Sequence, residues 1–366
     1  MIDRRLLTNF DWKVLLLILA IAAIGVLNIS SASASYKLTG LPFYLKQIYW
    51  LVIGCGLSLL VCSVDYHILE DFSYWLYGIL VIFLLLVLVV GRTSMGATRW
   101  LHLGFFTMQP SEPMKIVIIL TFASFFSRNQ APWLLGWREL WKPALILALP
   151  ALLIAKQPDL GTAIMVCLVA GTIVLAVGIR WSVVLSAVAA AVPLVYVAWN
   201  YLLRGYQKNR VLNFLDPERD PLKSGYHLIQ SKIAVGSGGI FGKGFMQGTQ
   251  SQLRFLPEQH TDFAFSVFAE EWGFAGVLVI LIMYLSFVLW GINVASRCGD
   301  RFGTLIAVGV TAMIFWHIVI NIGMVVGLFP VVGVPLPFFS YGGTSMITSM
   351  IGAGILLNIS MRRFMF

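Results

Sequence analysis

Ten long apolar segments recur along the chain, and they limit what it can fold into. Most of them are long enough for an α-helix to cross about 30 Å of hydrocarbon. In lipid only helices and closed barrels satisfy every backbone polar group, and segments of this length and composition are typical of helices. The predicted spans are residues 13–31, 44–64, 73–91, 113–127, 140–156, 160–178, 181–200, 263–295, 303–328 and 341–361. We therefore expect an all-α polytopic membrane protein with about ten transmembrane helices, forming a single integral membrane domain over residues 1–366.

Two places in this pattern are less regular than the rest. Only the short turn "KQPD" separates the fifth span from the sixth, so their division into two helices is the least certain part of the pattern. The eighth span is too long for one straight crossing, and we expect its first turns, residues 263–273, to lie outside the hydrocarbon core.

The distribution of Lys and Arg predicts the orientation in the membrane. With a cytoplasmic N-terminus, the cytoplasmic segments hold eleven basic residues and the short outer loops hold five, in line with the positive-inside rule. Both termini are then cytoplasmic, and residues 201–262 form a large extracytoplasmic loop between the seventh and eighth spans. The net charge of +9 is explained by this rim of basic residues, so we expect no nucleic-acid binding.

Polar residues break the apolar pattern in clusters on the predicted outer side. Before the fourth span, Ser111-Glu112-Pro113 is typical of a helix start, with Glu112 as a candidate cap and Lys115 in the first turn. This pair is either a cap with a neighbouring ion pair or a charged pair at the mouth of a cavity. Asp159, in the short turn before the sixth span, either caps that helix or orients a cation from the first cluster.

The long outer loop holds the densest polar signals. Residues 224–237 are typical of an amphipathic helix at the membrane surface, and "GSGGIFGKGFMQG" at 236–248 is rich in glycine. That segment is not a nucleotide-binding P-loop, because Lys243 is followed by Gly244 rather than by Ser or Thr. It is either a flexible loop or a backbone contact for a diphosphate. The loop ends in "FLPEQHTDFAF", which sets Glu258, His260 and Asp262 at the edge of a membrane helix, where ionisable groups are expensive.

Other sites of chemistry are not indicated. No closely spaced His, Cys and acidic residues are typical of a zinc site, and there is no G-x-S-x-G motif. The one His inside a predicted span, His317, is interpreted as a hydrogen-bond partner between helices. The uncharged segment "PVVGVPLPFFSYGGTS" at 330–345 can shape a site but offers no acid, base or nucleophile.

The polar clusters together resemble the SEDS family (shape, elongation, division and sporulation), and its RodA branch more than its FtsW branch. The matching motifs are "GATRWLHLG…QPSE" at 96–112, "QPDLGTA" at 157–163, the block at 216–265 that includes "GTQSQ" and "FLPEQHTDFAF", "AEEWG" at 269–273 and "PVVGVPLPFFSYGG" at 330–343. One departure is Pro113, where the family usually has an aliphatic residue.

The resemblance implies a peptidoglycan glycosyltransferase that polymerises lipid II outside the bacterial cytoplasmic membrane during cell elongation. By the motif match, Asp262 corresponds to the family's essential carboxylate. A carboxylate in that place can act as the general base that activates a sugar hydroxyl. Arg210, Lys243 and Lys115 are candidate cations for the departing lipid diphosphate, and Glu258 and His260 are nearby supports of unknown role. The substrate-binding set then comprises Glu112, Lys115, Asp159, Arg210, Lys243, Glu258 and His260.

Partners and alternatives follow from the same resemblance. It implies a class B penicillin-binding protein that crosslinks the new strand, along with other membrane proteins of the elongation complex. No cofactor or tightly held metal is expected, although a loosely bound Mg²⁺ or Mn²⁺ at the diphosphate stays open. The alternative functions are a lipid II flippase, which needs access from both sides of the membrane, and a non-catalytic scaffold, which does not need Asp262.

Overall fold

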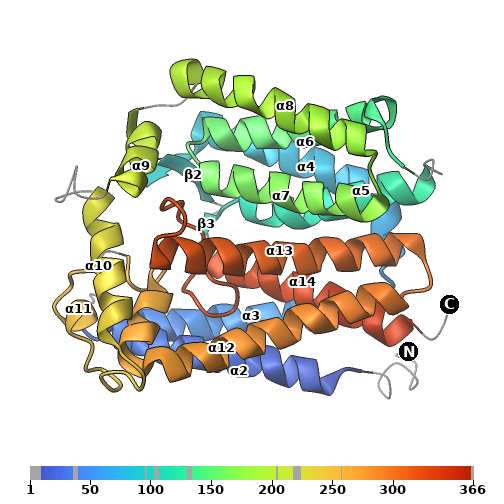
Figure 1. Ribbon diagram of the computed structural model, residues 1–366. Helices are drawn as coiled ribbons and strands as arrows, with labels where there is room; N and C mark the ends of the chain where they lie inside the picture. The colour runs from blue at the N-terminus through green and yellow to red at the C-terminus, as the bar shows by residue number, and fades with distance from the viewer. Residues whose placement is uncertain are drawn as a thin grey trace.

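The long helices lie side by side in a bundle, with both ends of the chain at one end of it (Figure 1). The computed structural model describes residues 10–35, 40–94, 97–102, 107–129, 134–202, 205–216, 224–256 and 258–363. The helices that coincide with the predicted spans are α2 (Trp12–Ser33), α3 (Phe43–Ser63), α4 (Ile68–Val90), α5 (Ser111–Arg128), α6 (Trp137–Lys156), α7 (Leu160–Val177), α8 (Trp181–Val197), α12 (Ala264–Arg297), α13 (Arg301–Val326) and α14 (Gly343–Arg362).

The helices differ in how deeply the bundle encloses them. Among the described residues, eight helices are long and apolar enough to cross a membrane. Helices α5 and α6 are the other two of the ten predicted spans, and they do not meet both criteria. Helix α5 carries Glu112, Lys115 and Arg128, which lower its hydropathy, but it packs against α4, α7 and α13 inside the bundle. Protein, rather than lipid, therefore surrounds the charges near its start. The separation of α6 from α7 is confirmed, whereas the number of crossings stays a prediction.

The segment between α8 and α12 has its own helices at the end of the bundle opposite the termini (Figure 1). They are the π-helical turn η1 (Ala198–Leu202), α9 (Gly205–Leu215), α10 (Ser224–Ser237) and α11 (Thr249–Gln252). The predicted amphipathic helix over 224–237 is present as α10, which runs across the spans and packs on α12 and α13.

A small β-sheet lies between α4 and α5, which the sequence pattern did not predict. Its strands are β1 (Arg92–Ser94), β2 (Ala97–His102) and β3 (Thr107–Met108), paired antiparallel in the order β1-β2-β3. A connection packed against helices must satisfy its own backbone donors and acceptors, and short hairpins do so. The sheet has a local role, because β2 carries Arg99 and Trp100 to the cavity described below.

Helix α12 is broken at Gly273, where φ is 63° and ψ is −165°. The backbone of residues 239–244 lies against this break. The N–H groups of Phe274 and Ala275 donate to the carbonyls of Gly239 and Ile240, both at 2.9 Å. The carbonyl freed at Glu270 accepts from the N–H of Lys243 at 3.0 Å. The first turns of the predicted eighth span are thus a separate segment held by the Gly-rich loop, and their place outside the hydrocarbon core stays a prediction.

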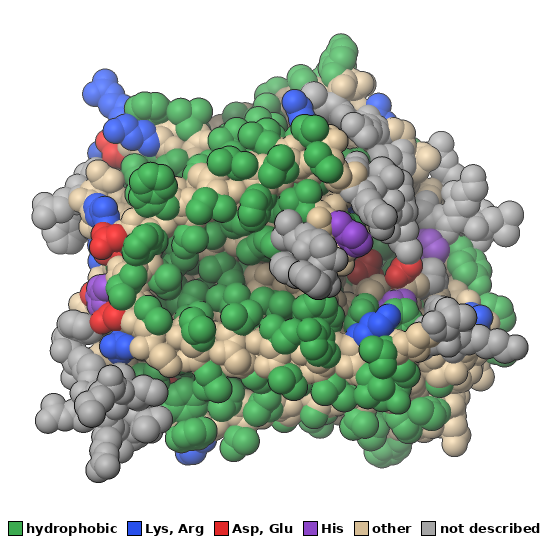
Figure 2. Space-filling model, turned by 180° about the vertical axis from the view of Figure 1, so that it is seen from behind, with side chains coloured by type: hydrophobic (Ala, Val, Ile, Leu, Met, Phe, Trp, Pro, Cys, Tyr) green, Lys and Arg blue, Asp and Glu red, His purple; other side chains and the backbone are tan. Residues whose placement is uncertain are grey.

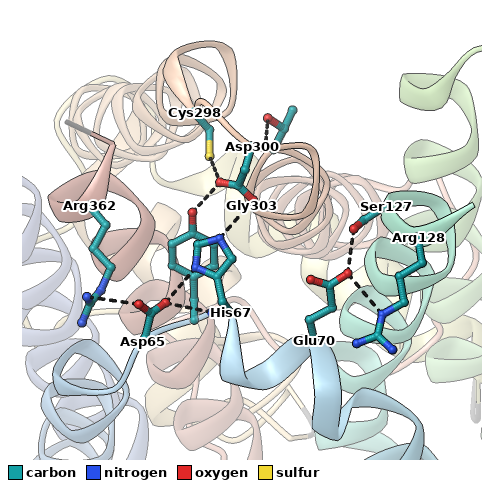
Figure 3. A network of polar contacts seen from close by, with 11 residues as sticks. Asp65, His67, Glu70, Ser127, Arg128, Cys298, Asp300, Gly303 and Arg362 are labelled. Carbon is teal, nitrogen blue, oxygen red and sulfur yellow. Dashed lines mark hydrogen bonds and ion pairs between the residues drawn. The ribbon is translucent and has the colours of Figure 1, made fainter. Parts of the chain in front are cut away.

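Polar contacts tie the α3–α4 and α12–α13 connections to the end of α14, at the end of the bundle where the termini lie (Figure 3). Asp300 caps α13 by accepting from the main-chain N–H of Gly303 at 2.7 Å, and His67 Nε2 lies 3.7 Å from the same carboxylate. His67 Nδ1 contacts Asp65 at 2.8 Å, and Arg362 lies 3.5 Å from Asp65. Figure 2 shows charged side chains gathered at the two ends of the molecule, with a hydrophobic band between them.

Candidate active site

A cavity of about 400 Å³ lies among the helix ends at the α9 end of the bundle. Figure 2 shows acidic and histidine side chains recessed between hydrophobic helices at this end. The charged side chains and the histidine in its wall are Arg99, Glu112, Lys115, Asp159, Arg210, Asp262 and His317. Five of the seven are predicted site residues, although these five are spread over 151 positions from Glu112 to Asp262.

Asp262 lies one residue before the N-cap position of α12, and its backbone is held from two sides. Asn321 of α13 donates from Nδ2 to the Asp262 carbonyl at 3.0 Å and to the Val334 carbonyl at 2.7 Å. On the other side, Gly333 has φ of 74°, a conformation that favours glycine, and a Cβ there would lie 3.1 Å from Asp262 Oδ2. The carboxylate is thus positioned between α13 and the segment that follows it.

The surroundings of Asp262 make it a weaker acid than usual. Burial raises its pKa to about 6, and the negative charge of Glu258 adds to this effect. Arg210 and Arg99 lower the pKa in opposition. A carboxyl group with this pKa is ionised at neutral pH and is a stronger base than an ordinary aspartate.

Asp159 both caps a helix and contacts a cation, so the two roles left open by the sequence coexist. It is the N-cap of α7, and its Oδ1 accepts from the main-chain N–H of Thr162 at 3.3 Å. Gln109 Nε2 donates to Oδ2 at 2.8 Å, and Arg99 Nη1 lies 3.8 Å from Oδ1. The Arg99 side chain also donates to the Pro158 carbonyl. Asp159 therefore holds Arg99 at the cavity wall.

Glu112 and Lys115 form a buried ion pair in the first turns of α5. The predicted capping role of Glu112 is wrong, because α5 starts at Ser111 with Pro110 in the N-cap position. Lys115 Nζ donates to Glu112 Oε1 at 2.9 Å and lies 2.8 Å from His317 Nε2. The Lys115 side chain is only 1% exposed, yet it reaches the cavity wall. The arrangement matches the reading of a charged pair at a cavity, and His317 is a partner between helices as expected.

Three of the remaining predicted residues lie at or next to the cavity. Arg210 projects from α9 into its wall. Glu258 has φ of 45° and accepts from the Thr261 hydroxyl at 3.3 Å. The His260 ring stacks on Phe43 at 4.2 Å, and burial lowers its pKa. Glu258 and His260 are not among the described residues that line the cavity, but they precede Asp262 by four and two positions in the chain.

Lys243 is the predicted site residue that the structure places elsewhere. Its Nζ lies 2.7 Å from Oε1 of the fully buried Glu270 and 2.8 Å from the Thr249 hydroxyl. Lys243 is not among the described residues of the cavity wall. A buried carboxylate needs a cationic partner, and Lys243 satisfies that need beside the break in α12. The prediction that it contacts a diphosphate is therefore not supported.

Several residues of the site escaped the sequence reasoning. Arg99 and Gln109 lie in the motif at 96–112, but no spacing rule distinguishes them from their neighbours. Asn321 is a polar side chain inside a predicted span, which is a usable signal because such residues need partners there. Gly333 gives no signal, since its close approach to Asp262 depends on the tertiary fold.

An apolar groove of about 690 Å³ adjoins the charged cavity. Trp50, Thr107 and Thr344 line both, so the two spaces share a wall. The rest of the groove is formed mainly by aliphatic and aromatic side chains of α3, α5 and α14, including Ile53, Ile116, Ile347 and Ile351. The pair of spaces suits a ligand with a charged head and an apolar tail. Among the described residues, no group of three His, Cys, Asp or Glu side chains is arranged to hold a metal ion.

Fold and site together define a polytopic helical membrane protein with a charged cavity beside an apolar groove at one end. Residues 11–364 match the FtsW/RodA/SpoVE family, described as cell cycle proteins. The chain is 40% identical to the peptidoglycan glycosyltransferase MrdB of Escherichia coli K12, covering 98% of this chain and 95% of that protein. It is 35% identical to the peptidoglycan glycosyltransferase RodA of Treponema pallidum, covering 97% and 98% respectively.

Solved structures agree with this assignment. A chain of a peptidoglycan synthase complex that coordinates polymerisation and crosslinking aligns with a TM-score of 0.83 at 34% identity, covering 98% of this chain and 99% of that chain. RodA of Thermus thermophilus aligns with a TM-score of 0.71 at 30% identity, covering 97% and 98%. The chain belongs to the FtsW/RodA/SpoVE family, which confirms the resemblance stated from the motifs.

Proposed function

We infer that the chain is a peptidoglycan glycosyltransferase in which Asp262 is the general base and lipid II is the substrate. Family membership and the identity to MrdB support the activity. The observation that carries the assignment of the site is the convergence of Asp262 with three basic side chains, Arg99, Lys115 and Arg210, in one cavity.

The chemistry needs one proton acceptor and a cationic environment. Asp262 takes the proton from the acceptor sugar hydroxyl while that oxygen forms a bond to the anomeric carbon of the donor sugar. The bond from this carbon to the diphosphate oxygen breaks, and the electron pair leaves with the lipid diphosphate. A base in hydrogen-bond reach contributes about 10²–10⁴-fold to such a step. The raised pKa of Asp262 suits it to this task near neutral pH.

The basic side chains of the cavity suit the leaving group. The diphosphate gains negative charge as the bond breaks, and fixed cations stabilise that charge in a site with little water. Asp159 orients Arg99, and Glu112 orients Lys115. If a divalent cation assists, we propose that it is recruited by the diphosphate, which chelation followed by Mg²⁺ or Mn²⁺ addition would test.

The adjoining groove supports a lipid-linked substrate. Its wall of isoleucine and aromatic side chains fits a hydrocarbon chain, while the shared residues Trp50 and Thr344 mark the place where head and tail would meet. A soluble sugar nucleotide would leave the groove without a role. We further propose that this end of the bundle is extracytoplasmic in a bacterial cytoplasmic membrane, on the basis of the Lys and Arg distribution.

Replacement of Asp262 by Asn tests the proposed base. Asn keeps the size and hydrogen-bonding capacity of Asp but cannot take the proton, so polymerisation should fall at least about a hundredfold. Asp262→Glu should also be impaired, because the carboxylate is displaced, whereas Glu258→Gln should be milder. The measurement is glycan-strand formation from fluorescent lipid II by purified variants, with melting curves to confirm folding.

The same assay separates the alternatives. Glycan strands made by the purified wild-type chain would exclude both a flippase without polymerase activity and a scaffold. A folded Asp262→Asn variant that makes normal amounts of glycan would contradict the role of Asp262 while leaving the family assignment intact.

A further inference from the structure

Among the described acidic, basic and histidine side chains of the cavity wall, His317 is the one to which the proposed chemistry gives no task. It lies in α13, its side chain is 3% exposed, and it touches two other elements. Its Nδ1 lies 3.1 Å from the Pro335 carbonyl oxygen, and its Nε2 lies 2.8 Å from Lys115 Nζ. The ring therefore bridges α5 and the segment after α13.

These two partners assign the protonation of the ring. A carbonyl oxygen only accepts hydrogen bonds, so Nδ1 must carry a hydrogen. An ammonium group only donates, so Nε2 must present its lone pair to Lys115. A doubly protonated ring would set an N–H against the ammonium group at 2.8 Å. His317 is therefore neutral, with its hydrogen on Nδ1.

The ring completes a two-acceptor cradle for Lys115. The ammonium group has three N–H bonds, and Glu112 Oε1 and His317 Nε2 accept two of them at 2.9 and 2.8 Å. Among the described residues no third side-chain acceptor lies within hydrogen-bond distance of this group, which leaves one N–H for a ligand in the cavity. A second carboxylate in the place of His317 would give the cluster a net negative charge. A neutral ring orients the ammonium group and adds no negative charge beyond that of Glu112. Lysine has a flexible four-carbon stem, so its charge is positioned only if partners hold it.

We propose that His317 is a positioning residue for the transfer step: it holds the Lys115 ammonium group where the negative charge of the departing diphosphate develops. This inference rests on the proposed function, since it needs a leaving group that becomes more negative. It predicts an effect on kcat rather than on KM, because the interaction strengthens only in the transition state.

Two conservative substitutions separate this role from a structural one. His317→Gln can place an oxygen near the position of Nε2 and so keep an acceptor for Lys115. His317→Asn can keep a donor near Nδ1 for Pro335 but is too short to reach Lys115. The proposal expects Gln to keep kcat close to wild type and Asn to lower it about ten- to a hundredfold, since a misplacement of about 1 Å can cost about a hundredfold. Thr311→Val is the matched control, because Thr311 is a buried polar residue of the same helix that does not line the cavity.

A double-mutant cycle with Lys115→Gln supplies the second readout. Gln keeps a donor for Glu112 but removes the charge, so His317→Asn should have no further effect on kcat in that background. The measurement is lipid II polymerisation with kcat and KM determined separately, together with melting temperatures. The proposal is overturned if His317→Asn is as active as wild type, if His317→Gln is impaired more than His317→Asn, or if His317→Asn and Lys115→Gln lower kcat by independent factors that multiply.

Normal glycan synthesis by Asp262→Asn would instead remove the base assignment and leave this comparison to decide the role of His317.

Discussion

At the scale of single residues, Asp262 shows how environment changes the chemistry of a common side chain. Burial and the nearby Glu258 charge act in the same direction, and two arginines act against them, with a net pKa of about 6. Its backbone is held by Asn321, and its carboxylate faces Gly333. Packing holds this carboxylate in place, and its burial away from water raises its pKa.

The pH dependence of activity and of stability should therefore have opposite signs. The base must be ionised, so kcat/KM should rise with pH through about 6 in the wild-type enzyme. The folded-state pKa lies above the ordinary value of 3.8, so the folded chain binds more protons between these values and loses stability as pH rises through about 6. Asp262→Asn should consequently be more stable than wild type at pH 7.5, by about 1–3 kcal/mol of unfolding free energy. The reason is that a pKa raised from 3.8 to about 6 weakens the folded state by about 1.4 kcal/mol for each pH unit between the two values. The difference should vanish below pH 4, and equal melting at both pH values would contradict the raised pKa.

At the scale of elements, the break in α12 links the long outer segment to the bundle. Gly273 has a positive φ of 63° with ψ of −165°, a conformation essentially restricted to glycine, and an added Cβ there would lie 2.3 Å from the Gly242 nitrogen and 2.7 Å from the Ile240 oxygen. The helix must end its regular bonding at this point, and residues 239–244 accept and donate the backbone hydrogen bonds that the break frees. The ten residues 263–272 then connect the break directly to Asp262.

Gly273→Ala should lower both stability and activity. This backbone conformation costs an L-residue about 1–3 kcal/mol. The close backbone contacts add to that cost, because neither partner is a flexible side chain. Gly78→Ala in α4 is the matched control, since nothing lies within 4 Å of its added Cβ and alanine favours a helix more than glycine does. Melting temperatures and polymerisation rates of the two variants in the same lipid would test this. A Gly273→Ala variant that matches the Gly78→Ala variant would show that the break has no structural consequence.

At the scale of the whole molecule, α8 and α12 are among the helices that expose large apolar side chains on the outside of the bundle. Helix α8 is largely exposed along its length, and α12 exposes a row of large apolar side chains after the break. The similar chain in a peptidoglycan synthase complex is consistent with a crosslinking partner. We therefore propose that crosslinking is supplied by such a partner chain.

We expect a single-span penicillin-binding protein to pack its helix against α12 or α13. Ile282→Trp with Leu285→Trp enlarges two exposed positions of α12, which should weaken co-purification of the partner without loss of glycan synthesis by the isolated chain. Leu185→Trp with Val188→Trp on α8 is the control, because these side chains have the same spacing and similar exposure. Loss of the partner after the α8 changes, or after charge reversal in the outer loop alone, would point to a different interface.

The sequence by itself determined the membrane class, the positions of the helices and most of the residues at the site. These features are local: an apolar run of sufficient length must form a helix in lipid, and a carboxylate such as Asp159 caps the helix that starts beside it. Tertiary structure alone decided which polar groups meet. Lys115 and His317 are separated by 202 positions and are joined by the packing of α5 on α13. Lys243, which looked equally suited to a diphosphate, pairs with Glu270 instead, because a buried carboxylate beside a broken helix binds the nearest cation.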